Sequence, residues 1–257
     1  MSETSVTWWG HSTMWLVDSG TTLLTDPLLS DRLLHLRRMV GPTPRLPGAP
    51  DAVLLSHLHV DHFHLPSLRA VPGTPLLIVP RGAAAFVAQA MGPAWADRCV
   101  ELVPGEETTV GSVKVRAVPA AHPGDRGPWS RSRAVALGFV VEGDSRTWYA
   151  GDTGLFDEMS ELAPLDLALI PVGGWGPTLG PRVHLDAAAG AEALRRVKSS
   201  WAVPVHYGTF WPIGLTRFRP HMFSDPGEEF ARRAARTTPD TRVRVLDHGE
   251  TLTIGPE

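Results

Sequence analysis

Histidine and aspartate are concentrated in one short stretch of the sequence, His57-Leu58-His59-Val60-Asp61-His62. Imidazole and carboxylate groups are common ligands of transition metals. The preceding run, Ala52-Val53-Leu54-Leu55-Ser56, predicts a buried strand. Residues two apart on extended backbone point to the same side, so His57 and His59 can face one ion. Asp61 and His62 follow in the turn and can face a second ion, and Pro66 suits the first turn of a following helix. The stretch therefore predicts a metal site on a strand-to-helix loop.

Three further polar side chains follow predicted strands. They are His122 after Pro119-Ala120-Ala121, Asp152 in Tyr149-Ala150-Gly151-Asp152, and His206 after Val203-Pro204-Val205. Each alone has a plain alternative, a buried core histidine or a turn-forming aspartate, because polar residues are common at strand ends and in loops. Their occurrence together with the first cluster favours one shared metal site.

The elements that must position these residues alternate between strands and helices. Strands are expected at 6–9, 13–17, 21–25, 76–79, 113–118, 134–142, 146–150, 165–171, 201–205, 241–246 and 250–254, and helices at 81–91, 156–162, 185–198 and 226–236. Two β-rich halves with helices outside predict paired sheets in the middle of a four-layer αββα sandwich, an α/β fold. No repeat or linker interrupts the sequence, so we expect one domain over residues 1–257.

Composition limits the class of protein. The 257 residues are 43% hydrophobic and 20% charged, which is ordinary for a globular protein, and the formal charge of −3 gives no support for a nucleic-acid partner. Cys99 is the only cysteine, which excludes internal disulfides and zinc sites built on thiolates. We find no secretory signal and no apolar segment of bilayer-spanning length. These features predict a cytoplasmic protein.

The motifs together resemble those of the metallo-β-lactamase superfamily of metal-dependent hydrolases. Asp26 in Leu24-Thr25-Asp26-Pro27 is similar to its first motif, the cluster from His57 to His62 to its second, and His122, Asp152 and His206 to the remaining three. Trp9-Gly10-His11-Ser12-Thr13, Ile170-Pro171-Val172-Gly173 and His206-Tyr207-Gly208-Thr209-Phe210 are similar to one branch. That branch contains the N-acyl-phosphatidylethanolamine phospholipase D enzymes and the ascorbate-6-phosphate lactonases. His184-Leu185-Asp186 resembles a segment of the same branch, although Ala187, Ala188 and Ala189 replace the proline and glutamates expected there.

The resemblance implies two divalent ions, with zinc favoured over iron or manganese. One ion would take His57, His59 and His122, the other Asp61, His62 and His206, and Asp152 would bridge them. It also implies that a metal-bridging hydroxide attacks the substrate, with Asp61 orienting the proton of that nucleophile. His184 is our candidate to protonate the leaving group or to bind the oxyanion; the alternative is a helix N-terminal residue that merely lies near the mouth of the site. Asp26 is expected to hold a ligand histidine in its tautomer, and His11 to support the site.

The resemblance further implies a hydrolase acting on a phosphodiester, with a lactonase acting on a sugar-phosphate lactone as the alternative. A metallo-ribonuclease is less favoured because of the acidic balance, and a non-catalytic metal-binding module is less favoured because the ligand set is complete. The expected substrate is a small-molecule or lipid-like ester, with peripheral contact to a membrane left open.

Other segments leave two interpretations open. Residues 28–40 mix apolar and basic side chains and predict either a partly packed surface helix or a cap that meets an acyl chain or a membrane. Arg126, Arg131 and Arg133 either hold a phosphate or form a solvated loop. The tryptophans near motif loops, Trp129, Trp175 and Trp211, either line an apolar pocket or pack in the core.

Overall fold

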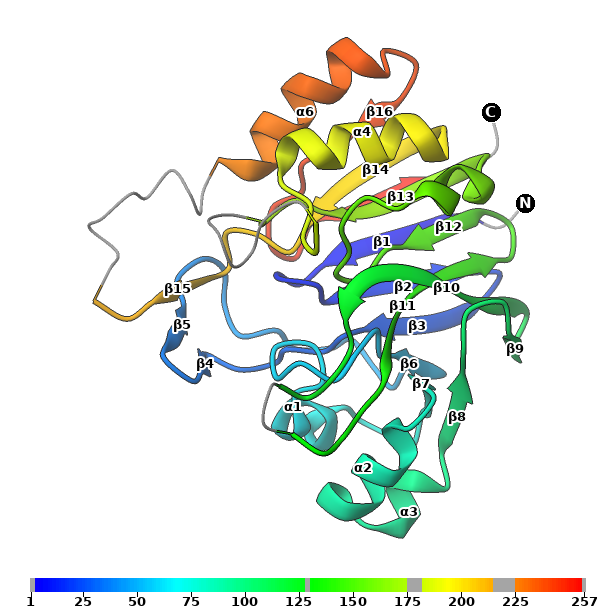
Figure 1. Ribbon diagram of the computed structural model, residues 1–257, viewed down its shortest axis with the longest axis vertical. Helices are drawn as coiled ribbons and strands as arrows, with labels where there is room; N and C mark the ends of the chain where they lie inside the picture. Colours follow the sequence, from blue (N-terminus) through cyan, green and yellow to red (C-terminus); the bar gives the residue numbers. More distant parts are fainter. Residues whose placement is uncertain (1–2, 128–129, 175–181, 215–224, 256–257) are drawn as a thin grey trace.

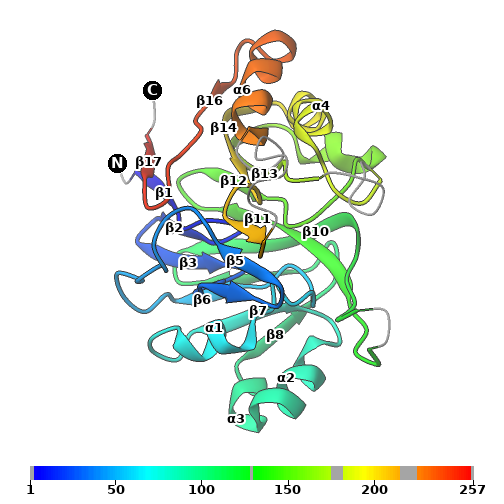
Figure 2. The same cartoon turned by 90° about the vertical axis from the view of Figure 1, so that its left-hand side faces the viewer.

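Two seven-stranded sheets lie face to face between two layers of helices in the computed structural model, which describes residues 3–127, 130–174, 182–214 and 225–255 (Figures 1 and 2). This arrangement confirms the predicted αββα sandwich. Trp129 and Trp175 lie outside the described residues. Within the described part of the chain, no helix combines the length and the apolar character needed to cross a bilayer.

The first sheet has the strand order β17-β1-β2-β3-β6-β7-β8. Its strands are β1 Thr4–Trp8, β2 Met14–Asp18, β3 Thr21–Thr25, β6 Ala52–Leu54, β7 Leu76–Pro80, β8 Cys99–Leu102 and β17 Thr251–Ile254. β3, β6, β7 and β8 run parallel, so their carboxyl ends lie at one edge. The helices α1 Leu65–Ala70, α2 Ala83–Met91 and α3 Pro93–Ala96 pack on its outer face.

The second sheet has the order β16-β14-β13-β12-β11-β10-β9. Its strands are β9 Glu107–Val110, β10 Val113–Pro123, β11 Val135–Glu142, β12 Arg146–Tyr149, β13 Leu165–Pro171, β14 Ser199–Val205 and β16 Arg242–Val243. β12, β13 and β14 run parallel. The 3-10 helix η1 Asp157–Leu162 and the helices α4 Ala187–Val197 and α6 Pro226–Thr237 cover the outer face. α4 begins after Asp186, whose side chain accepts hydrogen bonds from the backbone of Ala188 and Ala189.

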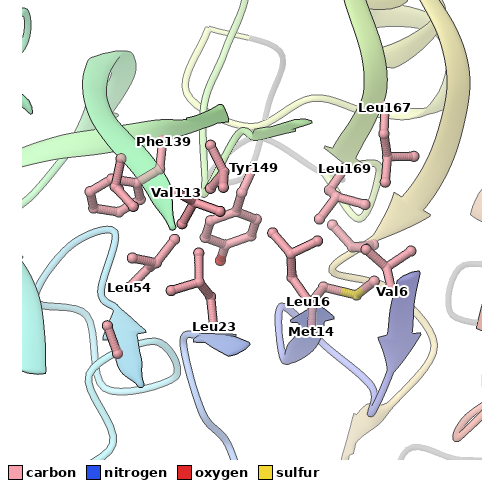
Figure 3. Packing of buried hydrophobic residues seen from close by; sticks show 14 of the residues in the cluster. Val6, Met14, Leu16, Leu23, Leu54, Val113, Phe139, Tyr149, Leu167 and Leu169 are labelled. Carbon is pink, nitrogen blue, oxygen red and sulfur yellow. The ribbon is translucent and has the colours of Figure 1, made fainter. Parts of the chain in front are cut away.

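The main hydrophobic core lies between the two sheets. Figure 3 shows Leu16 and Leu23 of the first sheet packed opposite Phe139 and Leu169 of the second. These four side chains are at most 1% exposed. Each buried aliphatic or aromatic side chain contributes about 1.5–3 kcal/mol through the hydrophobic effect. This core therefore fixes how the two sheets face each other, and with it the position of the loops at their common edge.

A third, small sheet projects from the sandwich (Figure 1), with the order β15-β5-β4. Its strands are β4 Arg32–Leu33, β5 Leu36–Arg38 and β15 Phe210–Pro212. The helix expected within residues 28–40 is therefore wrong. Leu34 adopts a left-handed conformation with φ 52°, which turns the chain between β4 and β5. Leu33 and Arg38 are buried, and the guanidinium of Arg38 donates to the carbonyl of Leu28. These tertiary contacts therefore override the helical pattern.

The other predicted elements are found with small shifts in their ends, and three differences stand out. The strand expected at 241–246 is limited to Arg242–Val243, because the chain after it leaves the edge of the sheet as a loop. The helix expected at 156–162 is a 3-10 helix. The strands β8 and β9 were not predicted, since both are four residues long and partly exposed, and neither shows a clear alternation of burial.

Candidate metal centre

All seven predicted ligands lie together at the edge of the sandwich where the parallel strands end. The loop from β6 to α1 carries His57, His59, Asp61 and His62. The second sheet supplies the other three, His122 within β10, Asp152 after β12 and His206 after β14. In parallel sheets, ligand sites form at the carboxyl ends of the strands. The position of the cluster therefore follows from the fold.

One ligand group combines His57, His59 and His122. His59 Nδ1 lies 2.9 Å from His57 Nε2 and 3.1 Å from His122 Nε2. His122 Nδ1 donates to the carbonyl of Val183 at 2.8 Å, which leaves Nε2 free to bind a metal. Burial lowers the pKa of His122 to about 4, so its ring is neutral at physiological pH, as a ligand must be.

A second group combines Asp61, His62 and His206, with His11 joining them. Asp61 Oδ2 lies 3.2 Å from His11 Nε2, 3.6 Å from His62 Nε2 and 3.8 Å from His206 Nε2. His11 was expected to have a supporting role, whereas the structure places its ring nitrogen among the candidate ligand atoms. The His11 carbonyl also accepts a hydrogen bond from the His206 backbone at 2.9 Å, so the two loops position each other.

Asp152 lies between the two groups. Its Oδ2 is 3.2 Å from His62 Nε2, and its Oδ1 is 3.2 Å from His206 Nε2. His184, which precedes α4, lies on the other side, with Nε2 3.4 Å from Asp152 Oδ2 and its ring 4.6 Å from that of His122. The ring of His184 therefore enters the site, and its donor atom is close enough to the others to be a candidate ligand as well as a candidate proton donor.

A fully buried hydrogen-bond network behind the ligands is centred on Asp26. Its Oδ2 accepts from Tyr149 Oη at 2.5 Å and from His62 Nδ1 at 2.6 Å, and its Oδ1 accepts from the backbone of Ser56 at 2.8 Å. With Nδ1 of His62 held in this way, Nε2 faces the ligand cluster. The Ser56 hydroxyl also lies 2.9 Å from His57 Nδ1. Ser56 and Tyr149 were not predicted as site residues, although both adjoin ligand motifs in the sequence.

The carboxylates determine the electrostatics of the centre. Burial lowers the pKa of His62, but Asp152, Asp61 and Asp26 outweigh it and raise that pKa well above its ordinary value. Burial also lowers the pKa of His206, yet Asp152 in particular brings it to about 9. These carboxylates stabilise positive charge at the cluster, which is the property that attracts a cation.

The close approach of two loops depends on Gly173. A Cβ atom at this position would lie 1.9 Å from the carbonyl oxygen of His206. His206 itself has a left-handed backbone with φ 59°, which turns its side chain toward Asp152 after β14 ends. Any larger residue at 173 would displace the His206 loop, so the glycine in Ile170-Pro171-Val172-Gly173 has a defined steric role.

The structure also distinguishes the two interpretations of the arginines. Arg126 Nη1 donates to the carbonyls of Leu58 at 2.9 Å and Phe63 at 2.6 Å, so it holds the backbone of the ligand loop. Arg133 is exposed and pairs with Asp125. Arg131 is exposed. None of these contacts places a guanidinium at the ligand cluster.

The donor set fits divalent transition metals. Buried polar atoms nearly always have hydrogen-bond partners, yet His62 Nε2, His206 Nε2 and Asp152 Oδ1 are buried without one among the described residues. The two nitrogens lie 3.2 to 3.8 Å from carboxylate oxygens of Asp152 and Asp61. Ligands about 2.1 Å from a tetrahedral ion lie about 3.4 Å apart. Imidazole and carboxylate groups at these separations are suited to zinc, iron or manganese.

Solved structures share this fold. A metallo hydrolase from the archaeon Ignicoccus hospitalis, Igni18, superposes with a TM-score of 0.73 at 22% identity, over 100% of both chains. An isothiocyanate hydrolase from Delia radicum gut bacteria superposes with a TM-score of 0.68 at 19% identity, over 96% of this chain and 98% of its own. At these identities the likeness concerns the fold.

The family follows from sequence comparison. The profile described as the beta-lactamase superfamily domain matches residues 21–207, more than half of the chain. A UPF0173 metal-dependent hydrolase of Methanoculleus marisnigri is 32% identical, over 98% of this chain and 97% of its own length. The chain belongs to the metallo-β-lactamase superfamily of metal-dependent hydrolases, as its motifs predicted.

Two further relatives match most of this chain. An N-acyl-phosphatidylethanolamine-hydrolyzing phospholipase D of Caenorhabditis elegans is 27% identical, over 95% of this chain and 74% of its own length. An uncharacterized protein of Mycobacterium tuberculosis is 32% identical over 91% of this chain, and the matched region spans 64% of that relative's length.

Proposed function

We propose that this protein is a dinuclear metal-dependent phosphodiesterase. One ion would be held by His57, His59 and His122 and the other by Asp61, His62 and His206, with Asp152 shared between them. The observation that carries the proposal is the convergence of these donors in two adjacent groups. Their buried nitrogens and a carboxylate oxygen have no hydrogen-bond partner among the residues that the structure describes. Ions bound there would supply Lewis acidity and make water more acidic near neutral pH.

Differences in exposure support different tasks for the three carboxylates. The side chain of Asp61 is 28% exposed, whereas those of Asp152 and Asp26 are 3% and 0% exposed. Only Asp61 can therefore accept a proton from water that enters from the mouth. A hydrogen bond from His11 Nε2 to Asp61 Oδ2, which lie 3.2 Å apart, would orient the carboxylate for this role and would keep that nitrogen of His11 out of the ligand set.

His184 is the proposed general acid. Its side chain is 12% exposed, and its Nε2 lies close to Asp152, so the ring borders both the solvent and the ligand cluster. From this position its imidazole can protonate a leaving oxygen or hold an oxyanion. Zinc is the proposed metal because four-coordinate sites of histidine and carboxylate are typical of it.

The substrate class is proposed from the branch. A relative covering most of this chain is named as a phospholipase D acting on N-acyl-phosphatidylethanolamine, a phosphodiester. Purified protein loaded with zinc, iron or manganese would be assayed on a generic aryl phosphodiester and on sugar lactones. We expect turnover of the phosphodiester to exceed that of the lactones. Preference for lactones would contradict the substrate class while leaving the metal centre in place.

A further inference from the structure

Exposed apolar side chains gather at the small sheet. Among the described residues, six large hydrophobic side chains are exposed, and four of them lie on or beside β4, β5 and β15. Leu34 at the hairpin tip is 76% exposed, Ile213 is 53%, Met39 is 43% and Val40 is 44% exposed. The Ile213 amide donates to the carbonyl of His35 at 2.9 Å, which places Ile213 beside the tip. Large exposed apolar groups gathered in one place indicate an interaction surface.

Strand alternation adds two arginines to this surface. Leu33 and Arg38 are buried against the sandwich, so Arg32 and Arg37 point to the opposite side. The strand register places Arg32 directly opposite Arg37. Met39 and Ile213 fall on that same side by the same alternation. We call this set, with the tip residue Leu34, the outer face of the small sheet.

The charge on the outer face is unbalanced. Like charges directly opposite each other destabilise an antiparallel pair. In the described part of the protein, neither Arg32 nor Arg37 is paired with a carboxylate, and both are exposed. The adjacent Asp31 is engaged by the hydroxyl of Thr43. An external anion would relieve the repulsion between the two guanidinium groups.

The dimensions of the outer face argue against a second copy of the chain as its occupant. Three strands about 4.8 Å apart, two or three residues long at about 3.3 Å per residue, give a flat backbone footprint of roughly 150 Å². A stable protein interface buries about 800 Å² of accessible surface on each partner, so a second copy would have to cover much more of the protein than this sheet. A small projecting face with arginines among apolar side chains is better suited to the headgroup region of a bilayer, where arginines bind phosphates and apolar side chains reach the acyl boundary.

The opposite, buried side of the small sheet contacts the metal centre. Phe210 of β15 lies edge-on to the ring of His11, with centroids 6.0 Å apart. The backbone amide of Met39 donates to the carbonyl of Thr209. The hydroxyl of Thr209 in turn accepts a hydrogen bond from the backbone amide of His11 at 2.7 Å. Figure 2 shows β5 and β15 on the side of the molecule that faces the viewer there. A surface bound by this sheet would lie close to the candidate site.

We propose that the outer face of the small sheet docks the protein on bilayers that contain anionic phospholipids. Arg32 and Arg37 would contact lipid phosphates, while Leu34 and Ile213 would enter the headgroup region. The proposal goes beyond the proposed hydrolysis, because docking requires no turnover. It can therefore fail while the phosphodiesterase stands, and the reverse also holds.

Flotation of the full-length protein with vesicles tests the proposal. We expect flotation with phosphatidylcholine vesicles that contain phosphatidylglycerol, and little with phosphatidylcholine alone. Arg32→Glu combined with Arg37→Glu should weaken partitioning at least about tenfold, because each arginine near an anionic surface adds to binding. Leu34→Ser combined with Ile213→Ser should also weaken it. The matched control is Leu76→Ser combined with Val135→Ser, which removes two exposed hydrophobic side chains away from the small sheet and should bind as wild type.

Metal content and circular dichroism of each variant report on folding. The absence of flotation with either vesicle would overturn the proposal, as would equal flotation with both. Flotation unchanged in the arginine or the Leu34 and Ile213 variants would also overturn it. Sedimentation that shows a dimer lost on substitution of Leu34 and Ile213 would assign the face to a second copy of the chain instead.

Discussion

His59 and His184 both line the site, but they occupy different places in it. His59 Nδ1 lies at hydrogen-bonding distance from both other members of its ligand group, whereas His184 Nε2 lies 3.4 Å from the shared Asp152. Loss of His59 therefore removes a central donor. Loss of His184 leaves the seven proposed donors in place. The two residues offer a way to separate metal binding from proton transfer.

The substitution His59→Ala should abolish bound metal and turnover together. His184→Ala should retain metal and lower kcat by about 10²–10⁴-fold, the usual contribution of a general acid. Elemental analysis and steady-state assays on the same preparations check both. Turnover unaffected by His184→Ala would show that its catalytic role is wrong, and loss of metal in that variant would make it a ligand.

Asp26 acts through the histidine it holds. Asp26→Asn should weaken metal binding about 10–100-fold, as substitutions behind metal ligands usually do. Asp18 is a matched control, because it is 1% exposed and fully hydrogen-bonded, with Ser145 Oγ at 2.8 Å, but it lies away from the ligands. Asp18→Asn should lower stability and leave metal affinity unchanged. Titration with a competing chelator measures the affinity, and equal affinity in both variants would contradict the role of Asp26.

Among the elements, the loop from β6 to α1 contributes most to the candidate site, because it carries four proposed ligands. Its backbone is irregular, so other segments must hold it in place. Arg126 holds this loop by two carbonyls and lies 5.0 Å above the ring of Phe86. The backbone of Leu58 also donates to the carbonyl of Gly124 at 2.9 Å. The loop is thus fixed from the segment that follows β10.

Replacing Arg126 with alanine should destabilise the protein by about 1.5–3 kcal/mol, because two charge-assisted hydrogen bonds to buried carbonyls are lost. Arg133→Ala, which removes an exposed ion pair, should cost at most about 1 kcal/mol. Urea unfolding measures both. If Arg126→Ala instead raised KM with stability intact, the side chain would be a substrate ligand.

The sequence was informative where chemistry and local pattern coincide. The candidate ligands that follow apolar strands could be predicted from residue type and spacing, and the strands themselves predicted the sandwich. Tyr149 could not be linked to Asp26, because 123 residues separate them and no periodic signal connects the two. β4 and β5 are two and three residues long, too short to show the period of a strand, so the small sheet became visible only in three dimensions.

In the molecule as a whole, each proposed ligand group draws its donors from both sheets. His57 and His59 follow a strand of the first sheet, and His122 lies on the second. Asp61 and His62 likewise face His206 across the sandwich. Each proposed ion would therefore tie together the two halves of the protein.

Chelation should lower the melting temperature of the whole protein in a single cooperative transition. With free metal at 100 times Kd, binding stabilises the folded state by about 2.7 kcal/mol, which is about 5–10 °C for a chain of this size. Calorimetry with and without chelator measures the shift, and His59→Ala serves as the control. A melting temperature unchanged by chelator in the metal-loaded wild type would contradict this linkage.

The chain first passes from the first sheet to the second in the connection between β8 and β9, residues 103–106, which is largely exposed. A protein severed there would consist of two fragments, each carrying an incomplete set of donors. Neither fragment alone would bind metal as tightly as the intact protein, and a bound metal ion would hold the two fragments together. The fraction of reassembled protein would then depend on the metal concentration, so the two fragments together would serve as a sensor of that concentration.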